Sequence, residues 1–402
     1  MADRAVDVLL IGGGTASAAC AQTLRTQGFG GSVLLAAREL DPPYDRPPLT
    51  KQYLRGEQDR SASHLPQSGW FDADATELLT RTSVTKLDTA AKLATLSTKQ
   101  TVAYGKALLA TGAMVRRLQV PGTDLDGLHY IRAYGNSDAI RAELDQARSI
   151  VCVGGSYIGC EVAASLTALG KQVTIVMLED DPLGRGFGAT AGTYFRSLLE
   201  SHGVTVVGGD EVERFEGSER VERVVTKGGR EIDAQLVVCG VGVLPDVMLA
   251  RSAGIDLGES GGVRCDESLR ASAPCIWAAG DVCEYESVVH DRQRIRVEHA
   301  DHAWNQGAHV ARAMLGDESP YDVVPYFFSD LADWASLEYV GPAYRWDDEV
   351  VTGETTTGQF GVWYLEAGRV RGALSVGGGL DLDRARELLR SGEAVGRAGL
   401  DG

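Results

Sequence analysis

The chain has 402 residues, more than one hydrophobic core usually supports, so we expect two or three domains. Hydrophobic residues make up 44% of it and charged residues 24%, which is ordinary for a globular protein, and no apolar run approaches the roughly 20 residues of a membrane span. We therefore expect no membrane segment. The net charge of −17 opposes a broad nucleic-acid-binding surface, so we expect no nucleic-acid partner either.

The first predicted element is an apolar strand at residues 6–11, followed by the glycine turn IGGGTAS and a helix. Gly12 and Gly14 occupy the first two positions of the pattern G-x-G-x-x-G, and the small Ser17 occupies the third. The first glycine permits a tight turn, the second lets a pyrophosphate approach the backbone, and the helix N-terminus favours negative charge. This turn therefore predicts a dinucleotide site.

Two charged residues, Arg38 and Glu39, follow the second apolar strand of this unit. They stand at about the distance from the glycine turn at which an acidic residue meets a ribose hydroxyl. Glu39 is the candidate for that contact, and the alternative interpretation is a solvated surface charge.

Residues 148–179 repeat the order of strand, glycine turn, helix and strand. Gly154 and Gly159 hold the outer glycine positions, while Ser156 replaces the middle one and adds a side chain where a phosphate should come closest. Glu179 follows the second strand, with Met177 slightly nearer the usual ribose position. An acidic residue with no adjacent Arg or Lys favours NADH over NADPH. Two such turns in repeated units are a much stronger signal than one.

The remaining elements complete a three-domain α/β prediction. The segment KGGREIDAQLVVCGVG (227–242) predicts a hairpin leading into a buried strand. Beyond about residue 320 we expect antiparallel strands at 360–365 and 370–376, a turn at 366–368 and a polar helix at 382–389. The predicted domains are two Rossmann-like dinucleotide-binding domains (1–113 with 247–320, and 114–246) and a C-terminal α+β domain (321–402).

Cysteine and histidine usage predicts neither disulfides nor a metal site. The seven cysteines form no C-x-x-C unit and lie among small or apolar residues, as buried free cysteines do. His299 and His302 lack the further partners that a metal would need. The first strand also begins too near the start of the chain to leave room for a secretory signal, so we expect a cytoplasmic protein.

Several motifs resemble those of known flavoproteins. LLATGA (108–113) and IWAAGD (276–281) resemble the two internal FAD motifs of glutathione-reductase-like flavoproteins. YDRPPLTKQYLRG (44–56), GGSYIGCEVAASL (154–166), RVEHADHAWNQGAHVAR (296–312) and PYFFSDL (325–331) resemble, more narrowly, the NAD(P)H-dependent ferredoxin or rubredoxin reductases that serve oxygenases. The resemblance spans essentially the whole chain and implies FAD and NADH as cofactors. It makes residues 1–113 and 247–320 the FAD-binding domain and residues 114–246 the NAD(H)-binding domain.

The resemblance also implies roles for individual residues. Asp281 would bond the ribityl chain or pyrophosphate of FAD from the start of a helix, and Lys51 would lie beside the isoalloxazine. Glu161 would pair with Lys51 near the nicotinamide, and these two are the predicted catalytic residues. Arg132, with backbone near Val84, would support the adenine half of FAD. For each charged residue the alternative is a surface ion pair.

Motifs and resemblance together predict one set of cofactor-binding residues. They are Gly12, Gly14, Thr15, Ala16, Arg38, Glu39, Arg46, Lys51, Val84, Ala110, Thr111, Gly112, Arg132, Gly154, Ser156, Tyr157, Ile158, Gly159, Glu179, Gly242, Gly280, Asp281, Glu298, His299, Ala300 and Phe328.

The chain departs from this family at five positions that bear on the acceptor and on the exposure of the flavin. Many relatives have an acidic residue at Arg38, Gly at Ser156 and Thr at Ala271, and an aromatic at Ala300 and Trp at Phe328 are frequent.

The absence of certain cysteines bears on where the electrons go. No cysteine lies between residues 21 and 150, where thiol-dependent relatives carry theirs. We therefore expect single-electron delivery to an iron-sulfur ferredoxin or rubredoxin that feeds an oxygenase. The alternatives are a signalling flavoprotein like apoptosis-inducing factor and an NADH-dependent reductase of a small molecule such as a quinone.

A last expectation concerns docking of the acceptor. Arg292, Arg294 and Arg296 alternate, so in a strand they would point to one face and form a positive patch for an acidic ferredoxin. The alternative is that these arginines pair with the many surrounding carboxylates.

Overall fold

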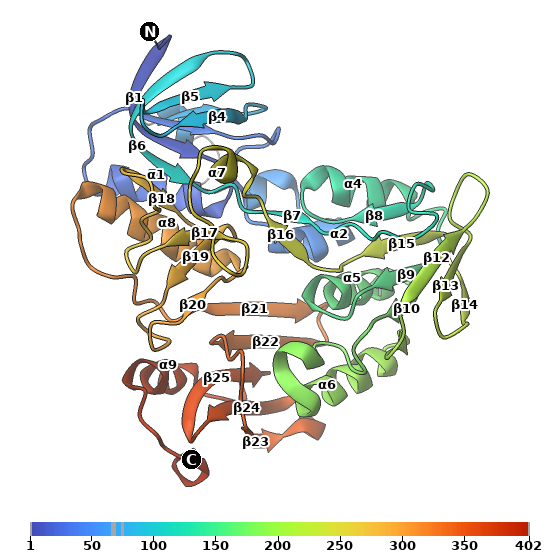
Figure 1. The fold of residues 1–402 in the computed structure, drawn as a ribbon. Helices are drawn as coiled ribbons and strands as arrows, with labels where there is room; N and C mark the ends of the chain where they lie inside the picture. The colour runs from blue at the N-terminus through green and yellow to red at the C-terminus, as the bar shows by residue number, and fades with distance from the viewer. Residues whose placement is uncertain (1, 66–69, 74–75, 401–402) are drawn as a thin grey trace.

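A computed structural model describes residues 2–65, 70–73 and 76–400 and divides the chain among three sheet-centred regions (Figure 1). Two regions are built on parallel sheets, and the third is an antiparallel sheet at the C-terminal end. The N-terminus lies in the first region and the C-terminus in the third, at opposite ends of the view. None of the helices in the described segments is both long and apolar enough to cross a membrane.

The first region contains the parallel order β3-β2-β1-β6-β18, with an antiparallel extension from β6 through β5 to β4. Its central strands are buried and rich in Val, Leu and Ile, as expected where helices cover both faces of a sheet. The strands are β1 (Arg4–Ile11), β2 (Val33–Ala36), β3 (Thr76–Leu79), β4 (Val84–Asp88), β5 (Leu93–Leu96), β6 (Thr101–Leu109) and β18 (Ile276–Ala278). The helical segments are α1 (Thr15–Thr26), η1 (Pro47–Thr50), α2 (Gln52–Arg55), η2 (Arg60–Ser63), α3 (Trp70–Ala73), α7 (Met248–Ser252) and α8 (Ala300–Leu315).

The second region repeats this topology in the order β11-β10-β9-β15-β8, all parallel. Its strands are β8 (Leu128–Tyr130), β9 (Ser149–Val153), β10 (Gln172–Val176), β11 (Thr205–Val207) and β15 (Leu236–Cys239), and its helices are α4 (Tyr134–Glu143), α5 (Tyr157–Ala168) and α6 (Gly184–Ser201). The predicted hairpin is confirmed within a small antiparallel sheet of β12 (Val212–Glu216), β13 (Arg223–Thr226) and β14 (Glu231–Asp233).

Strand register confirms the internal repeat residue by residue. Ile11 of β1 pairs with Ala36 of β2, and Val153 of β9 pairs with Val176 of β10. A glycine turn follows the first strand of each pair. Glu39 follows the end of β2 at Ala36 by the same number of residues as Glu179 follows the end of β10 at Val176. Each unit therefore carries an acidic residue at the equivalent position.

Two short strands connect the first two regions. β7 (Ala113–Val115) leaves the first region and β16 (Val243–Pro245) returns to it, and the two pair antiparallel. The returning chain then forms a small sheet of β17 (Val263–Cys265), β19 (Cys283–Glu286) and β20 (Arg294–Ile295).

The third region is the antiparallel sheet β21-β22-β25-β24-β23, with α9 packed on it. Its strands are β21 (Tyr326–Leu331), β22 (Ala335–Val340), β23 (Asp348–Glu354), β24 (Gln359–Glu366) and β25 (Arg369–Val376), and its helical segments are η3 (Thr355–Thr357), α9 (Leu382–Ser391) and η4 (Arg397–Gly399). The predicted strand pair and helix are therefore confirmed.

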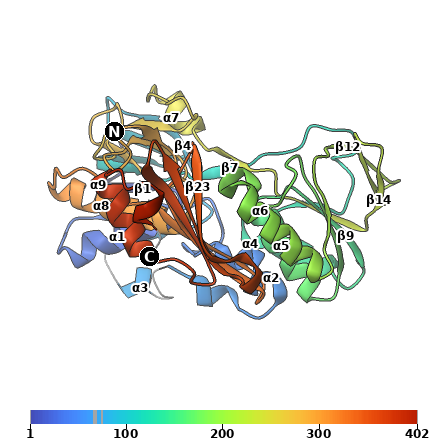
Figure 2. The same ribbon diagram turned by 90° about the horizontal axis from the view of Figure 1, so that it is seen from below.

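Helix α6 of the second region packs against this sheet (Figure 2). The Tyr364 hydroxyl donates a hydrogen bond to the Phe187 carbonyl at 2.9 Å, and Tyr194 meets Phe360 edge to face. The second and third regions thus share one core.

The predicted arginine strand is wrong. Only Arg294 and Ile295 are extended, and Arg292 lies in a turn with φ of 61°. Arg292 pairs with Glu267 at 2.6 Å and Glu286 at 2.8 Å, and Arg294 also reaches Glu286. Glu267 lies in the turn after β17 and Glu286 ends the neighbouring strand β19, and together they neutralise the positive patch, so the alternative interpretation holds.

Gly159 should not tolerate a side chain, because a Cβ there would lie 1.9 Å from the Gly154 carbonyl oxygen. We expect Gly159→Ala to lower the free energy of unfolding by about 1–3 kcal/mol, measured from the denaturant midpoint. Gly135→Ala is the control, since its Cβ would meet nothing within 4 Å and alanine favours a helix. Equal stability of the two variants would contradict this account of the turn.

Candidate functional site

A cavity of about 750 Å³ lies where the three regions meet, lined by residues from both glycine turns, from η1, from the start of α8 and from β21. It gathers most of the predicted residues. Those on its wall are Gly12, Gly14, Thr15, Ala16, Arg38, Glu39, Arg46, Lys51, Val84, Ala110, Thr111, Gly112, Arg132, Ser156, Tyr157, Ile158, Glu161, Gly242, Gly280, Asp281, Glu298, His299, Ala300 and Phe328.

Three predicted residues lie away from the cavity wall. Gly154 and Gly159 pack beneath the second turn, where a Cβ on Gly154 would lie 2.3 Å from the Gly240 carbonyl oxygen. They shape the turn through backbone contact. Glu179 is half-buried in the segment after β10 and is absent from this wall.

The first glycine turn forms an open cradle on the cavity. Gly12 has φ of 119°, and a Cβ on it would lie 2.1 Å from the Ala110 carbonyl oxygen, so a side chain is excluded at the bend. Gly14 caps α1, and a Cβ there would meet nothing within 4 Å. The unpaired amides of the α1 N-terminus therefore face open space that suits a phosphate.

The second turn faces the same cavity. Ser156 caps α5, makes no side-chain cap hydrogen bond and is exposed on the cavity wall. Its hydroxyl is thus available to a ligand, and the α5 N-terminus gives a second place for negative charge.

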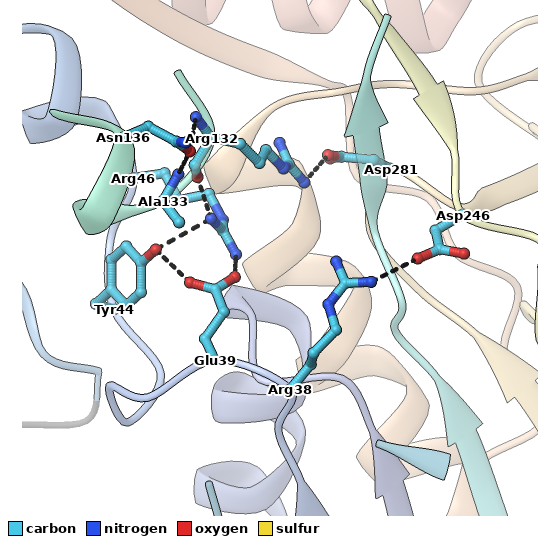
Figure 3. A network of polar contacts seen from close by, with 9 residues as sticks. All are labelled: Arg38, Glu39, Tyr44, Arg46, Arg132, Ala133, Asn136, Asp246 and Asp281. Carbon is cyan, nitrogen blue, oxygen red and sulfur yellow. Dashed lines mark hydrogen bonds and ion pairs between the residues drawn. The ribbon is translucent and has the colours of Figure 1, made fainter. Parts of the chain in front are cut away.

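A polar network holds Glu39 on the cavity wall (Figure 3). Arg46 contacts its carboxylate at 2.6 Å, and the Tyr44 hydroxyl donates to the same group at 2.5 Å. Burial works to raise the pKa of Glu39, but Arg46, Tyr44 and Arg132 outweigh burial and hold that pKa below its usual value. The carboxylate is therefore ionised and fixed in position.

Arg132 pairs with Asp281 at 2.9 Å (Figure 3), on the same wall as Val84. The expected place of Asp281 at the start of a helix is wrong. Asp281 lies in the turn between β18 and β19, and the nearby helix α8 begins only at Ala300. Its carboxylate is held by Arg132 rather than by helix amides.

A buried ion pair joins all three regions beside the cavity. Lys51 Nζ lies 2.6 Å from Glu161 Oε1, and both side chains are less than 10% exposed. The Thr50 hydroxyl donates to Glu161 Oε2 at 2.5 Å, and the Ser329 hydroxyl donates to Oε1 at 2.5 Å. The predicted pair is present, and Thr50 and Ser329 complete its hydrogen bonding. Neither hydroxyl was predicted, although PYFFSDL contains Ser329.

An aromatic cluster stands next to this ion pair. His299 stacks on Phe327 with ring centroids 4.1 Å apart, and Tyr157 meets Phe327 edge to face at 4.9 Å. Burial lowers the pKa of His299 to about 4, against the opposing influence of Asp281, so the imidazole is neutral at pH 7. Phe328 points the other way along β21 and is 44% exposed.

Asp246 is a cavity residue that the sequence did not identify. It follows β16 directly and pairs with Arg38 at 3.5 Å (Figure 3). No local pattern marks it, because its partner lies more than two hundred positions earlier in the chain.

Within the described segments, no group of three or more His, Cys, Asp or Glu residues could hold a metal ion. His302 is fully buried, and burial lowers its pKa to about 3. All seven cysteines are free.

Comparison with known proteins gives consistent matches over nearly the whole chain. Residues 6–307 match the family described as pyridine nucleotide-disulphide oxidoreductase, and residues 326–401 match the family described as reductase C-terminal. The chain is 36% identical over 395 residues to the 5,5'-dehydrodivanillate O-demethylase ferredoxin reductase subunit of Sphingobium sp., covering 97% of this chain and 95% of that one.

Solved structures agree with these matches. The ferredoxin reductase for the CYP199A2 system from Rhodopseudomonas palustris is similar with a TM-score of 0.93 and 30% identity, covering 98% of this chain and 97% of that one. The covalent putidaredoxin reductase-putidaredoxin complex contains a chain similar with a TM-score of 0.92 and 28% identity, covering 100% of this chain and 96% of that one.

Breaking the buried pair should be costly. Glu161→Gln keeps the size of the side chain but removes the carboxylate that contacts the buried Lys51, so we expect a loss of about 3–5 kcal/mol in the free energy of unfolding. Denaturant unfolding measures it. The variant Lys51→Met/Glu161→Leu removes both charges and should recover most of the loss. If Glu161→Gln alone were as stable as the wild type, the pair would not be an essential contact between the regions.

Proposed function

The chain belongs to the pyridine nucleotide-disulphide oxidoreductase family, and from this membership we propose that it is a flavoprotein reductase that carries electrons from NADH through FAD to an iron-sulfur ferredoxin or rubredoxin. The observation that carries the proposal is that both helix-capping turns, at Gly14 and at Ser156, open onto one cavity beside the Lys51–Glu161 pair. Two dinucleotides can therefore approach each other there.

The first turn fits FAD. The open space above Gly14 and the α1 N-terminus would receive the pyrophosphate, and Glu39, held by Arg46, would accept hydrogen bonds from ribose hydroxyls. Arg132 would hold Asp281 at the middle of the cofactor. When bound, FAD supplies the means to take two electrons together from a nicotinamide and release them one at a time.

The chain's own residues fix a positive charge at the reacting end of the cavity and exclude water from it. Lys51 carries a buried positive charge, and the ion pair with Glu161 holds its side chain in place. A fixed positive charge therefore lies at the reacting end of the cavity. The Tyr157, His299 and Phe327 rings keep water from that end and give apolar surfaces for planar groups. The neutral His299 adds no competing charge.

We also propose a division of the chain into cofactor domains. We assign FAD to residues 1–113 and 247–320, NAD(H) to residues 114–246 and a C-terminal α+β domain to residues 321–402. The two parallel sheets with matched register support the first two assignments, and the antiparallel sheet with α9 packed on it supports the third.

The similar proteins support an iron-sulfur acceptor, since one is a ferredoxin reductase subunit and another was solved bound to putidaredoxin. No cysteine lines the cavity in the described part of the chain, so electrons have no thiol to pass through there. The seven free thiols agree with a reducing compartment, and the cytoplasm is the proposed location.

The function is tested by electron delivery from the purified yellow protein. After anaerobic reduction by NADH, we expect faster transfer to members of a panel of iron-sulfur ferredoxins or to rubredoxin than to quinones. Faster reduction of quinones would favour a small-molecule reductase. Slow transfer to every acceptor, with a long-lived NADH-reduced complex, would favour a signalling flavoprotein.

Loss of the Glu161 carboxylate should slow reduction by NADH without loss of FAD. We expect Glu161→Ala, kept well below its unfolding temperature, to be reduced at least about tenfold more slowly in stopped flow, a barrier increase of about 1.4 kcal/mol. Glu57→Ala is the control, because Glu57 is exposed and pairs with Arg55 away from the cavity wall. A wild-type rate in Glu161→Ala would leave the pair a structural role only.

NADH should be used better than NADPH. Glu179 follows β10 at the position equivalent to Glu39, where a carboxylate would repel a 2′-phosphate. We expect kcat/KM with ferricyanide to favour NADH several-fold, and Glu179→Ala to reduce that ratio, while Glu213→Ala leaves it unchanged. Equal use of both donors by the wild type would contradict the assignment of Glu179.

A further inference from the structure

One ion pair on the cavity wall connects two distant parts of the chain at the surface. Arg38 lies two positions beyond β2 of the first region, and Asp246 directly follows β16, the strand that returns from the second region. Arg38 Nη1 and Asp246 Oδ2 are 3.5 Å apart (Figure 3). Both residues line the cavity, so the pair is part of its wall.

Asp246 is fixed while Arg38 is free to move. The Asp246 amide donates to the Gly112 carbonyl at 2.8 Å, and the Thr111 hydroxyl donates to the Asp246 carbonyl at 2.6 Å. The Asp246 side chain is only 15% exposed, whereas that of Arg38 is 67% exposed. The arginine can therefore leave its partner by rotating into solvent, without unpacking its surroundings.

The other two cavity arginines cannot move this way. The side chains of Arg46 and Arg132 are 24% and 28% exposed. Arg46 also donates to the Arg132 carbonyl and to Tyr44, which ties it into the wall. Of the three guanidinium–carboxylate pairs shown in Figure 3, the Arg38–Asp246 pair is thus the one that can open while the rest stays in place.

We propose that the Arg38–Asp246 pair is a latch that closes over bound FAD and slows its release. The inference rests on the proposed occupation of this cavity by FAD. The pair ties the segment after β2, beside the first glycine turn, to the segment after β16, so opening it removes one connection between two parts of the cavity wall. As an exposed pair it is weak and screened by salt.

The test measures the rate of FAD release by the rise in flavin fluorescence after dilution of the holoprotein. We compare the wild type with Arg38→Ala, Asp246→Asn and the double variant. Asp246→Asn keeps the backbone contacts to Gly112 and Thr111 and removes only the charge. We expect each single variant to release FAD about two- to fivefold faster than the wild type. The double variant should release it no faster than the single variants, because all three lose the same interaction.

Salt dependence gives a second readout. Raising the salt concentration should speed release from the wild type toward the rate of the variants and leave the variants nearly unchanged. Arg292→Ala is the matched control, because Arg292 is 65% exposed, pairs with Glu267 and is not part of the cavity wall. It should release FAD at the wild-type rate.

Two results would overturn the latch alone. One is release at the wild-type rate from a flavin-loaded Asp246→Asn protein, which would mean that Arg38 acts by contacting FAD directly or not at all. The other is a double variant that releases FAD much faster than either single variant, which would mean that the two residues act independently. A purified protein that binds no FAD would instead overturn the proposed function, and the latch with it.

Discussion

The structure depends on the pairing of one buried charge. Lys51 and Glu161 are almost wholly buried, and a buried ammonium or carboxylate without a partner would cost several kcal/mol. Glu161 accepts from Lys51 and Thr50 of the first region and from Ser329 of the third, while its own backbone belongs to α5 of the second. Three regions must therefore come together for this charge to be satisfied, and the cavity forms where they meet.

The electrostatics of the cavity follow a consistent pattern. Its guanidinium groups at Arg38, Arg46 and Arg132 are each matched with a carboxylate, so its side chains alone give little net attraction for a pyrophosphate. Backbone amides at the two helix N-termini remain for the phosphates. The carboxylates that pair with these arginines can accept hydrogen bonds from the sugar hydroxyls of a dinucleotide. Such a wall recognises sugars and phosphates at separate places, as a dinucleotide requires.

Local patterns predicted the fold well because its units are local. The two glycine turns, their strands and the hairpin depend on residues within about 30 positions of one another. The Lys51–Glu161 pair was found through the resemblance of two motifs. What could not be predicted depends on distant segments: the Glu267 that pairs with Arg292, the Arg132 that holds Asp281, and the Asp246 that meets Arg38. An alternating run of arginines cannot by itself show whether Glu267 and Glu286 will lie beside it.

The most direct test of this account is a crystal structure of the yellow protein, in which the position of the flavin ring is measured relative to Lys51. The account predicts that the ring lies in contact with Lys51 and the pyrophosphate over Gly14, with the adenine toward Val84. A ring at the Val84 end of the cavity, or outside it, would contradict the assignment of the buried pair to the reacting end.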